Sequence, residues 1–255
     1  MLMVSWKGIY AIWLREIKVY FREKERVLAS FISPLLWLFI FGGGLGSSIS
    51  INGINYQQFI FPGILTMSIL FSSVFFGVYI IWDRKLDFLK EVLVAPISRS
   101  TVFFGKLFGG ITDSMIQGLI LLTLGYLFFV QFSLINLIPI LVVMVLITWS
   151  MVALGLVIGA NMSTQEGFGL VQNFVIWPLF FFSGALFDVS SSDLPDFLKT
   201  ITQLDPLTYG VDALRTLILG HGSFPFYLDV AVLIVMGIIF SYLGVLSFGR
   251  MQQIK

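Results

Sequence analysis

The pattern of apolar and polar positions predicts six membrane-spanning helices. The apolar runs cover residues 28–45, 59–82, 102–130, 137–160, 168–186 and 227–248. A helix that crosses the hydrocarbon core of a bilayer needs roughly 20 mainly apolar residues. Polar or charged segments separate these runs. We therefore expect an all-α membrane protein.

Residues 1–27 predict an amphipathic helix ahead of the first span. Aromatic and aliphatic residues recur there at helical spacing: Trp6, Ile9, Tyr10, Trp13, Ile17 and Tyr20. Basic residues occupy the opposite face: Lys7, Arg15, Lys18 and Arg22. Such a helix lies at the membrane surface with its aromatic stripe inward and its bases toward lipid headgroups. A soluble amphipathic helix is the alternative.

The segment before the last span is more polar and predicts two short helices, over about 193–203 and 206–219. Asp205 followed by Pro206 is a favourable helix start, because Asp caps the first turn and Pro fits its first position. Gly220 is suited to end the second helix. Neither helix is long enough to span.

The charged residues give the expected orientation. Only 11% of the 255 residues are charged and 58% are hydrophobic, whereas about 25% are charged in a soluble domain. With six spans, all but Lys199 and Arg215 of the 15 lysines and arginines share one side with the two termini. Positive charge in short loops stays cytoplasmic. Both termini are therefore expected in the cytoplasm, and the loop 161–167, which carries no base, is the weakest part of this topology.

Several kinds of chemistry are not supported by the composition. The chain has no Cys and one His, so we expect neither a thiolate site nor a multi-His metal site. The glycines at 42–44 are not followed by the Lys and Ser/Thr of a phosphate-binding loop. A net charge of +1 gives no indication of a nucleic-acid partner. We expect no enzymatic activity, no metal and no cofactor on this chain.

Three blocks of sequence together resemble a known family. The first runs from Asp83 to Lys106, the second from Pro178 to Phe187, and the third from Asp205 to Arg215. In this order and spacing they resemble type-2 ABC exporter permeases, especially the daunorubicin-exporter and nodulation-factor branch. The residues that match the family motifs are Pro96, Ser98, Arg99, Gly105, Lys106, Ser183, Gly184, Pro206, Tyr209, Asp212 and Arg215. Asp205 departs from the pattern, where Asn is expected.

The resemblance implies a division of labour between subunits. Such permeases work as homodimers or heterodimers with two cytoplasmic ABC ATPase subunits, which bind ATP and Mg²⁺. Residues 1–27 would be the connecting helix and residues 28–255 the six-helix permease domain, with a re-entrant pair of helices at 193–219 near the external mouth. We expect a prokaryotic inner- or plasma-membrane exporter of a hydrophobic or amphipathic drug, lipid or glycan. The sequence does not identify the substrate.

The segment 83–95 resembles the coupling helix that docks on the ATPase. Leu86, Leu89 and Leu93 lie on one apolar stripe, and such a stripe flanked by charges is suited to a groove on a partner. The residues assigned to docking are Asp83, Arg84, Leu86, Asp87, Leu89, Lys90, Glu91 and Leu93. A solvated loop helix is the alternative.

Asp113 is the one acidic residue well inside a predicted span, where charge is costly and often functional. One interpretation places it on the translocation path or in a hydrogen bond with Gln117, one turn on. Another places it at the cytoplasmic end of its span. The rival function, an ion-coupled carrier or channel, would use Asp113 as its proton or cation site. Glu166 is a candidate second contact with the ATPase, and Asp212 is a candidate partner of Arg215.

Overall fold

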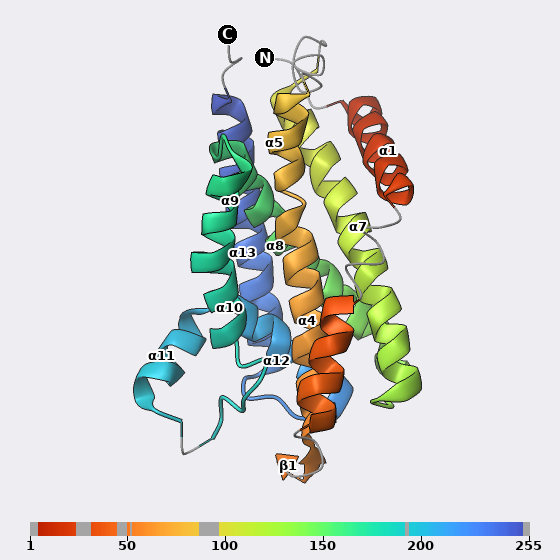
Figure 1. The fold of residues 1–255 in the computed structure, drawn as a ribbon, viewed down its shortest axis with the longest axis vertical. Coiled ribbons are helices and arrows are strands. Elements are labelled where there is room, and N and C mark those ends of the chain that lie inside the picture. Colours follow the sequence, from red (N-terminus) through yellow and green to blue (C-terminus); the bar gives the residue numbers. More distant parts are fainter. Residues whose placement is uncertain are drawn as a thin grey trace.

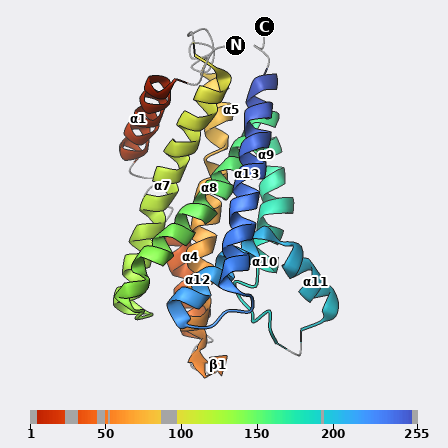
Figure 2. The same ribbon diagram turned by 180° about the vertical axis from the view of Figure 1, so that it is seen from behind.

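The computed structural model describes residues 5–23, 32–44, 50–51, 53–86, 97–191 and 194–251. The axes of the long helices lie roughly along the long axis of an elongated bundle, as Figures 1 and 2 show from opposite sides. The two ends of the chain lie at the same end of the bundle. A short hairpin, β1 (Ser50–Ile51) and β2 (Ile54–Asn55), lies at the other end. This placement agrees with the expected topology.

Within the described ranges, four helices are long and apolar enough to cross a membrane. The first combines α4 (Tyr56–Phe75) with α5 (Val78–Lys85). The others are α7 (Arg99–Phe128), α8 (Leu137–Asn161) with the preceding turn η2 (Leu134–Asn136), and α13 (Phe226–Arg250). An all-α membrane protein is confirmed.

The two remaining predicted spans are shorter or less regular. The first corresponds to the helix Ile32–Gly43, whose second half, η1 (Leu38–Gly43), is a π-helix. The fifth corresponds to three consecutive pieces: α9 (Gln165–Val171), the π-helix η3 (Gln172–Ile176) and α10 (Trp177–Phe182). Six spans therefore remain an expectation.

The two short helices before the last span form as predicted, as α11 (Asp196–Leu204) and α12 (Pro206–Leu219). Asp205 caps α12 by accepting a 2.8 Å hydrogen bond from the backbone N–H of Leu207. Gly220 ends α12 with a φ of 85°, a conformation that favours glycine. Both helices lie near the hairpin end of the bundle (Figure 1).

The α4–α5 unit is broken at Phe76 and Gly77, and the break is packed directly against α8. A Cβ atom added at Gly159 would lie 2.1 Å from the carbonyl oxygen of Gly77, and one at Gly155 would lie 2.6 Å from that of Val74. Only glycine permits two backbones to approach this closely. The break divides this span into α5, at the end of the bundle that holds the termini, and the longer α4.

The amphipathic helix forms as α1 (Trp6–Arg22), capped by Ser5. It lies along α7 at the end of the bundle that holds the termini (Figure 2). Gly105 and Gly109 of α7 allow the close approach, because a Cβ at either would lie 2.7 Å from the Cβ of Ile12 or Glu16. The predicted stripe is only partly correct: Ile9 and Tyr20 are buried, whereas Trp6 is 77% exposed.

Candidate functional site

Four charged side chains from three helices form an ion cluster at the end of the bundle that holds the termini. The Lys106 ammonium of α7 lies 3.0 Å from Glu16 Oε1 of α1 and 2.5 Å from Asp83 Oδ2 of α5. Arg15 completes the cluster, with its guanidinium 2.7 Å from Glu16 and 2.9 Å from Asp83. Two bases thus face two carboxylates.

The ion cluster is buried. The side chains of Lys106, Glu16 and Asp83 are only 1%, 2% and 4% exposed. Buried charges persist only when they are paired and hydrogen-bonded. The cluster therefore fixes the position of α1 relative to both α5 and α7.

The prediction that Arg15 lies on the lipid-facing side of α1 is wrong. The sequence pattern placed it with the lipid-facing bases, but its side chain is 31% exposed and turned toward Asp83. The reason is Glu16, which lies on the buried line of α1 with Ile9 and Ile12. Glu16 interrupts that apolar line and was the available signal for a buried partner, yet the sequence reasoning missed it.

The first two residues of the predicted docking segment lie within a helix of the bundle. Asp83 and Arg84 belong to the last turns of α5, and Asp83 lies inside the ion cluster. Arg84 donates hydrogen bonds of 2.5 Å to the carbonyl oxygens of Gly159 and Met162, at the end of α8. Leu86 follows the helix and is 76% exposed. The other predicted docking residues, Asp87, Leu89, Lys90, Glu91 and Leu93, and the motif residue Pro96 lie outside the described residues.

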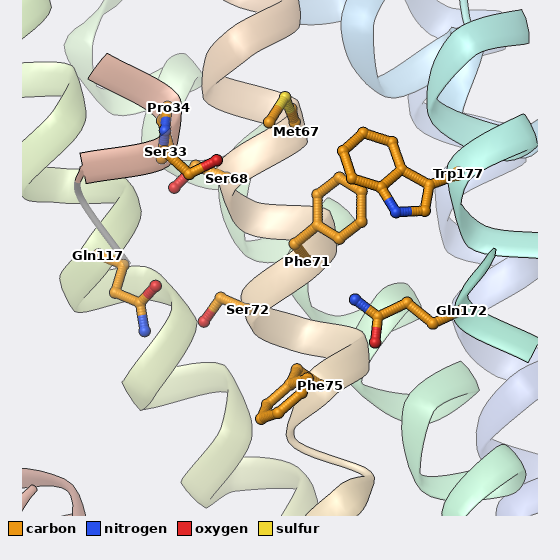
Figure 3. Close-up of a pocket in the computed structure, with 10 residues that line it drawn as sticks. All are labelled: Ser33, Pro34, Met67, Ser68, Phe71, Ser72, Phe75, Gln117, Gln172 and Trp177. Atoms are coloured by element: carbon orange, nitrogen blue, oxygen red, sulfur yellow. The ribbon is translucent and has the colours of Figure 1, made fainter. Parts of the chain in front are cut away.

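A pocket of about 360 Å³, here called the central pocket, lies farther along the bundle. Its walls come from the helix Ile32–Gly43, α4, α7, η3 and α10. Figure 3 shows the ten lining side chains: Ser33, Pro34, Met67, Ser68, Phe71, Ser72, Phe75, Gln117, Gln172 and Trp177. A volume above about 300 Å³ is typical of small-molecule sites.

Polar groups reach the central pocket from several helices. In Figure 3 Gln117 extends toward Ser72 from one side, and Gln172 extends toward α4 from the other. The Ser72 hydroxyl shares a 3.0 Å hydrogen bond with Ser114. The Ser68 hydroxyl is buried and has no hydrogen-bond partner among the described residues. Gln172 begins the π-helix η3, and such segments are frequent at functional sites.

Asp113 and Gln117 form the hydrogen bond that one interpretation predicted. Gln117 Nε2 donates to Asp113 Oδ1 over 3.0 Å, and both side chains are buried. Gln117 lines the central pocket, whereas Asp113, one helical turn away, is not among the lining residues. The sequence reasoning did not identify Ser68, Gln172 or Trp177, because nothing in the sequence indicates which helices meet.

The motif residues of the first block anchor helix ends. Ser98 caps α7 by accepting from the N–H of Thr101 over 3.2 Å. Arg99 donates to the carbonyl oxygens of Phe248 and Gly249 over 3.3 and 3.0 Å, which ties the start of α7 to the end of α13.

The motif residues of the second and third blocks meet at the opposite end. Arg215 of α12 donates a 2.7 Å hydrogen bond to the carbonyl oxygen of Gly184 and lies 4.2 Å above the ring of Phe59. Ser183 donates to the Phe180 carbonyl over 2.7 Å. Burial lowers the pKa of Arg215 to about 10, although nearby Asp212 and Asp188 raise it.

Asp212, the predicted partner of Arg215, also accepts hydrogen bonds from the backbone. Its carboxylate accepts from the N–H groups of Ser223 and Phe224 at 2.8–2.9 Å. The Tyr209 hydroxyl donates to the carbonyl of Gln203 over 2.8 Å. These bonds fix the turn between α12 and α13 and the junction of α11 with α12.

Asp205, at that junction, has an unusual environment. Burial raises its pKa to about 7, and the hydrogen bond from Leu207 only partly offsets this effect. Its second oxygen, Oδ2, has no hydrogen-bond partner among the described residues. Pro206 follows as the first residue of α12.

Glu166 lies in the first turn of α9 and is exposed. It is near the end of α5, since Gln165 accepts a 3.4 Å hydrogen bond from the indole of Trp82. The described residues contain no group of three or more His, Cys, Asp or Glu side chains suited to hold a metal ion.

The fold and these sites are those of a helical membrane protein with an internal pocket, and comparison with known proteins identifies the class. Residues 7–219 match the family described as ABC-2 type transporter, so the chain belongs to that family. The "Inner membrane transport permease YadH" of Escherichia coli K12 is 30% identical over 248 residues, covering 94% of each chain.

Two further relatives extend the likeness. The "Nodulation protein J" of Rhizobium meliloti is 28% identical over 255 residues, covering 90% of this chain and 93% of that protein. The "Putative transport permease ycf38" of Cyanophora paradoxa is 27% identical, covering 91% of this chain and 84% of that protein. The relatives are named as transport permeases or as a nodulation protein.

Proposed function

We propose that this chain is the membrane subunit of an ATP-driven exporter. The observation that carries the proposal is membership of the ABC-2 type transporter family along residues 7–219. ATP and Mg²⁺ are bound by separate cytoplasmic ATPase subunits, and a second permease chain, identical or different, completes the complex. The helix Ile32–Gly43 and the segment Gln165–Phe182 act as the first and fifth of six spans, with both termini in the cytoplasm of a prokaryotic cell.

The ion cluster supplies a route for mechanical coupling. The segment proposed to dock on the ATPase follows α5, and α5 ends two residues after Asp83. Asp83 is paired with Lys106 of α7 and with Arg15 of α1. A displacement of the docking segment therefore moves α1, α5 and α7 as one body, because separating them leaves buried charges without partners.

The central pocket is the proposed part of the translocation path within this chain. It lies beside α4, the outer half of the second span, whereas the docking segment follows α5, the inner half. The break at Phe76 and Gly77 separates these halves. Movement at the docking segment thus reaches the pocket wall through a single interrupted span. The short helices α11 and α12 are the proposed re-entrant pair at the external mouth.

Co-purification tests the docking assignment. The chain and a candidate cytoplasmic ABC ATPase from the same organism are expressed together and isolated from membranes through a tag on the permease. The double variant Leu89→Glu and Leu93→Glu is expected to lose the ATPase, because two carboxylates replace the proposed apolar contact. Leu134→Glu plus Ile135→Glu, at the exposed turn η2 toward the hairpin end, is the matched control and is expected to retain it. Retention by the docking variant refutes the assignment.

The alternative function, an ion-coupled carrier, predicts a different result when transport is measured in proteoliposomes. It would transport without an ATPase and would lose activity in Asp113→Asn. The hydrogen bond from Gln117 gives Asp113 a structural role that needs no coupling ion. We therefore expect transport to require both the ATPase and ATP.

A further inference from the structure

The central pocket is mainly apolar, with several hydrogen-bonding groups and no charge. Its lining from the described residues contains serine hydroxyls, glutamine amides and aromatic or apolar side chains, without Asp, Glu, Lys, Arg or His. Moving an ion from water into such a site costs several times what a hydrogen bond returns. The lining therefore favours an uncharged ligand and rejects a charged one.

The hydrogen-bonding groups of the pocket have capacity left for a ligand. Ser68 is 5% exposed, lines the pocket, and its hydroxyl has no partner among the described residues. Gln117 Nε2 is occupied by Asp113, which leaves its carbonyl oxygen as an acceptor. Ser72 shares one hydrogen bond with Ser114, and a hydroxyl can make up to three. Donors and acceptors at this spacing suit hydroxyl or amide groups.

An apolar surface lies beside the pocket's hydrogen-bonding groups. Trp177 and Phe71 form one aromatic wall, with ring centroids 4.6 Å apart. Ser33 also lines a second, apolar hollow, which follows Ile32, Leu36, Trp37, Ile40 and Phe41 of the first span. Ile32, Leu36 and Ile40 are each more than half exposed. Ser33 lines both hollows. A pocket with hydrogen-bonding groups beside an apolar hollow matches a molecule with a polar head and an apolar chain.

We propose that the central pocket binds the uncharged, hydroxyl- or amide-bearing head of an amphipathic molecule whose chain lies along the groove of the helix Ile32–Gly43. This inference rests on the proposed function and specifies the class of its substrate. Hydrogen bonds from Ser68, Gln117 and Gln172 hold the head, and Trp177 and Phe71 cover one side of it.

Photolabelling of the full chain in phosphatidylcholine nanodiscs tests this proposal. Three probes carry the same diazirine-bearing octyl chain and differ only in the head: β-D-glucoside, phosphate or trimethylammonium. We expect saturable labelling of the pocket helices by the glucoside, with half-saturation at least tenfold below that of either charged probe. Unlabelled octyl glucoside is expected to compete, whereas free glucose is not.

Variants connect the labelling to the pocket. Gln172→Leu and Ser68→Ala each remove one hydrogen-bonding group and are expected to weaken glucoside labelling about 2- to 10-fold, the equivalent of one hydrogen bond. Gln203→Leu, an exposed glutamine of α11, is the matched control and is expected to leave labelling unchanged. Melting temperatures establish whether each variant is folded. If Gln172→Leu does not fold, Ser68→Ala, the smaller change, provides the test.

Equal affinity for the three heads, or labelling that neither variant changes, overturns the proposal. Competition by free glucose as strong as by octyl glucoside overturns its amphipathic part. The assay contains no ATPase, so its failure is separable from that of the proposed function. A chain that still retains the ATPase in co-purification would remain a permease for a different class of substrate.

Discussion

Replacement of Lys106 by methionine removes the ammonium group that contacts both Glu16 and Asp83. Methionine keeps most of the side-chain volume without the charge. The two carboxylates, 2% and 4% exposed, are then left with Arg15 as their ion-pair partner among the described residues. Removing one partner of a buried ion pair costs about 3–5 kcal/mol. We therefore expect a large loss of stability from this single change.

Thermal unfolding of the purified chain in detergent measures the effect. Each kcal/mol shifts the melting temperature of a chain of this size by about 2–4 °C, so Lys106→Met is expected to lower it by about 6–20 °C. Lys18→Met, on the exposed face of α1, is the matched control and is expected to change stability by less than about 0.5 kcal/mol.

A second substitution tests the cause of the loss. Adding Asp83→Asn to Lys106→Met removes the carboxylate charge that the first change leaves in excess, and is expected to recover part of the lost stability. If Lys106→Met shifts the melting temperature no more than Lys18→Met does, the ion cluster does not hold α1 against the bundle. The coupling route proposed through Asp83 would then lose its physical basis.

Two other predictions concern single positions. Gly159→Ala places a Cβ 2.1 Å from the Gly77 carbonyl oxygen and is expected to lower the free energy of unfolding by about 1–3 kcal/mol through overpacking. Gly249→Ala, which has open space around it, is the control and is expected to cause no such loss. Equal melting temperatures for the two variants would contradict the close contact. Asp205→Asn is expected to stabilise the chain increasingly as pH rises from 4 to 7. Asp205 has a pKa of about 7 in the fold against 3.8 normally, so its ionisation opposes folding by up to about 4 kcal/mol above pH 7. A pH-independent gain in melting temperature between pH 4 and 8.5 would refute this reasoning.

The sequence predicted the helices well because their signals are local. Apolar runs located α7, α8 and α13 to within a few residues, and the Asp205–Pro206 pair located the start of α12. The Asp113–Gln117 bond was also predictable, since residues four apart meet on one helix face. The π-helices were not predicted.

Long-range contacts account for what was missed. Glu16, Asp83 and Lys106 lie on three different helices, and nothing in the sequence indicates that these helices meet. The glycines of α7 let α1 approach closely, and this approach buries the three charged side chains together. The central pocket depends in the same way on where five segments meet. The burial of Asp83, which the sequence pattern placed in a cytoplasmic docking helix, was missed for this reason.

The central claim is that the segment after α5 faces the cytoplasm, where an ATPase can reach it. Because the chain has no cysteine, Lys90→Cys and Lys199→Cys each give a single thiol for a membrane-impermeant maleimide. In intact cells, with the outer membrane permeabilised where one is present, we expect labelling of Lys199→Cys but not of Lys90→Cys, which should react only after the inner membrane is opened. Labelling of Lys90→Cys from outside would contradict the account.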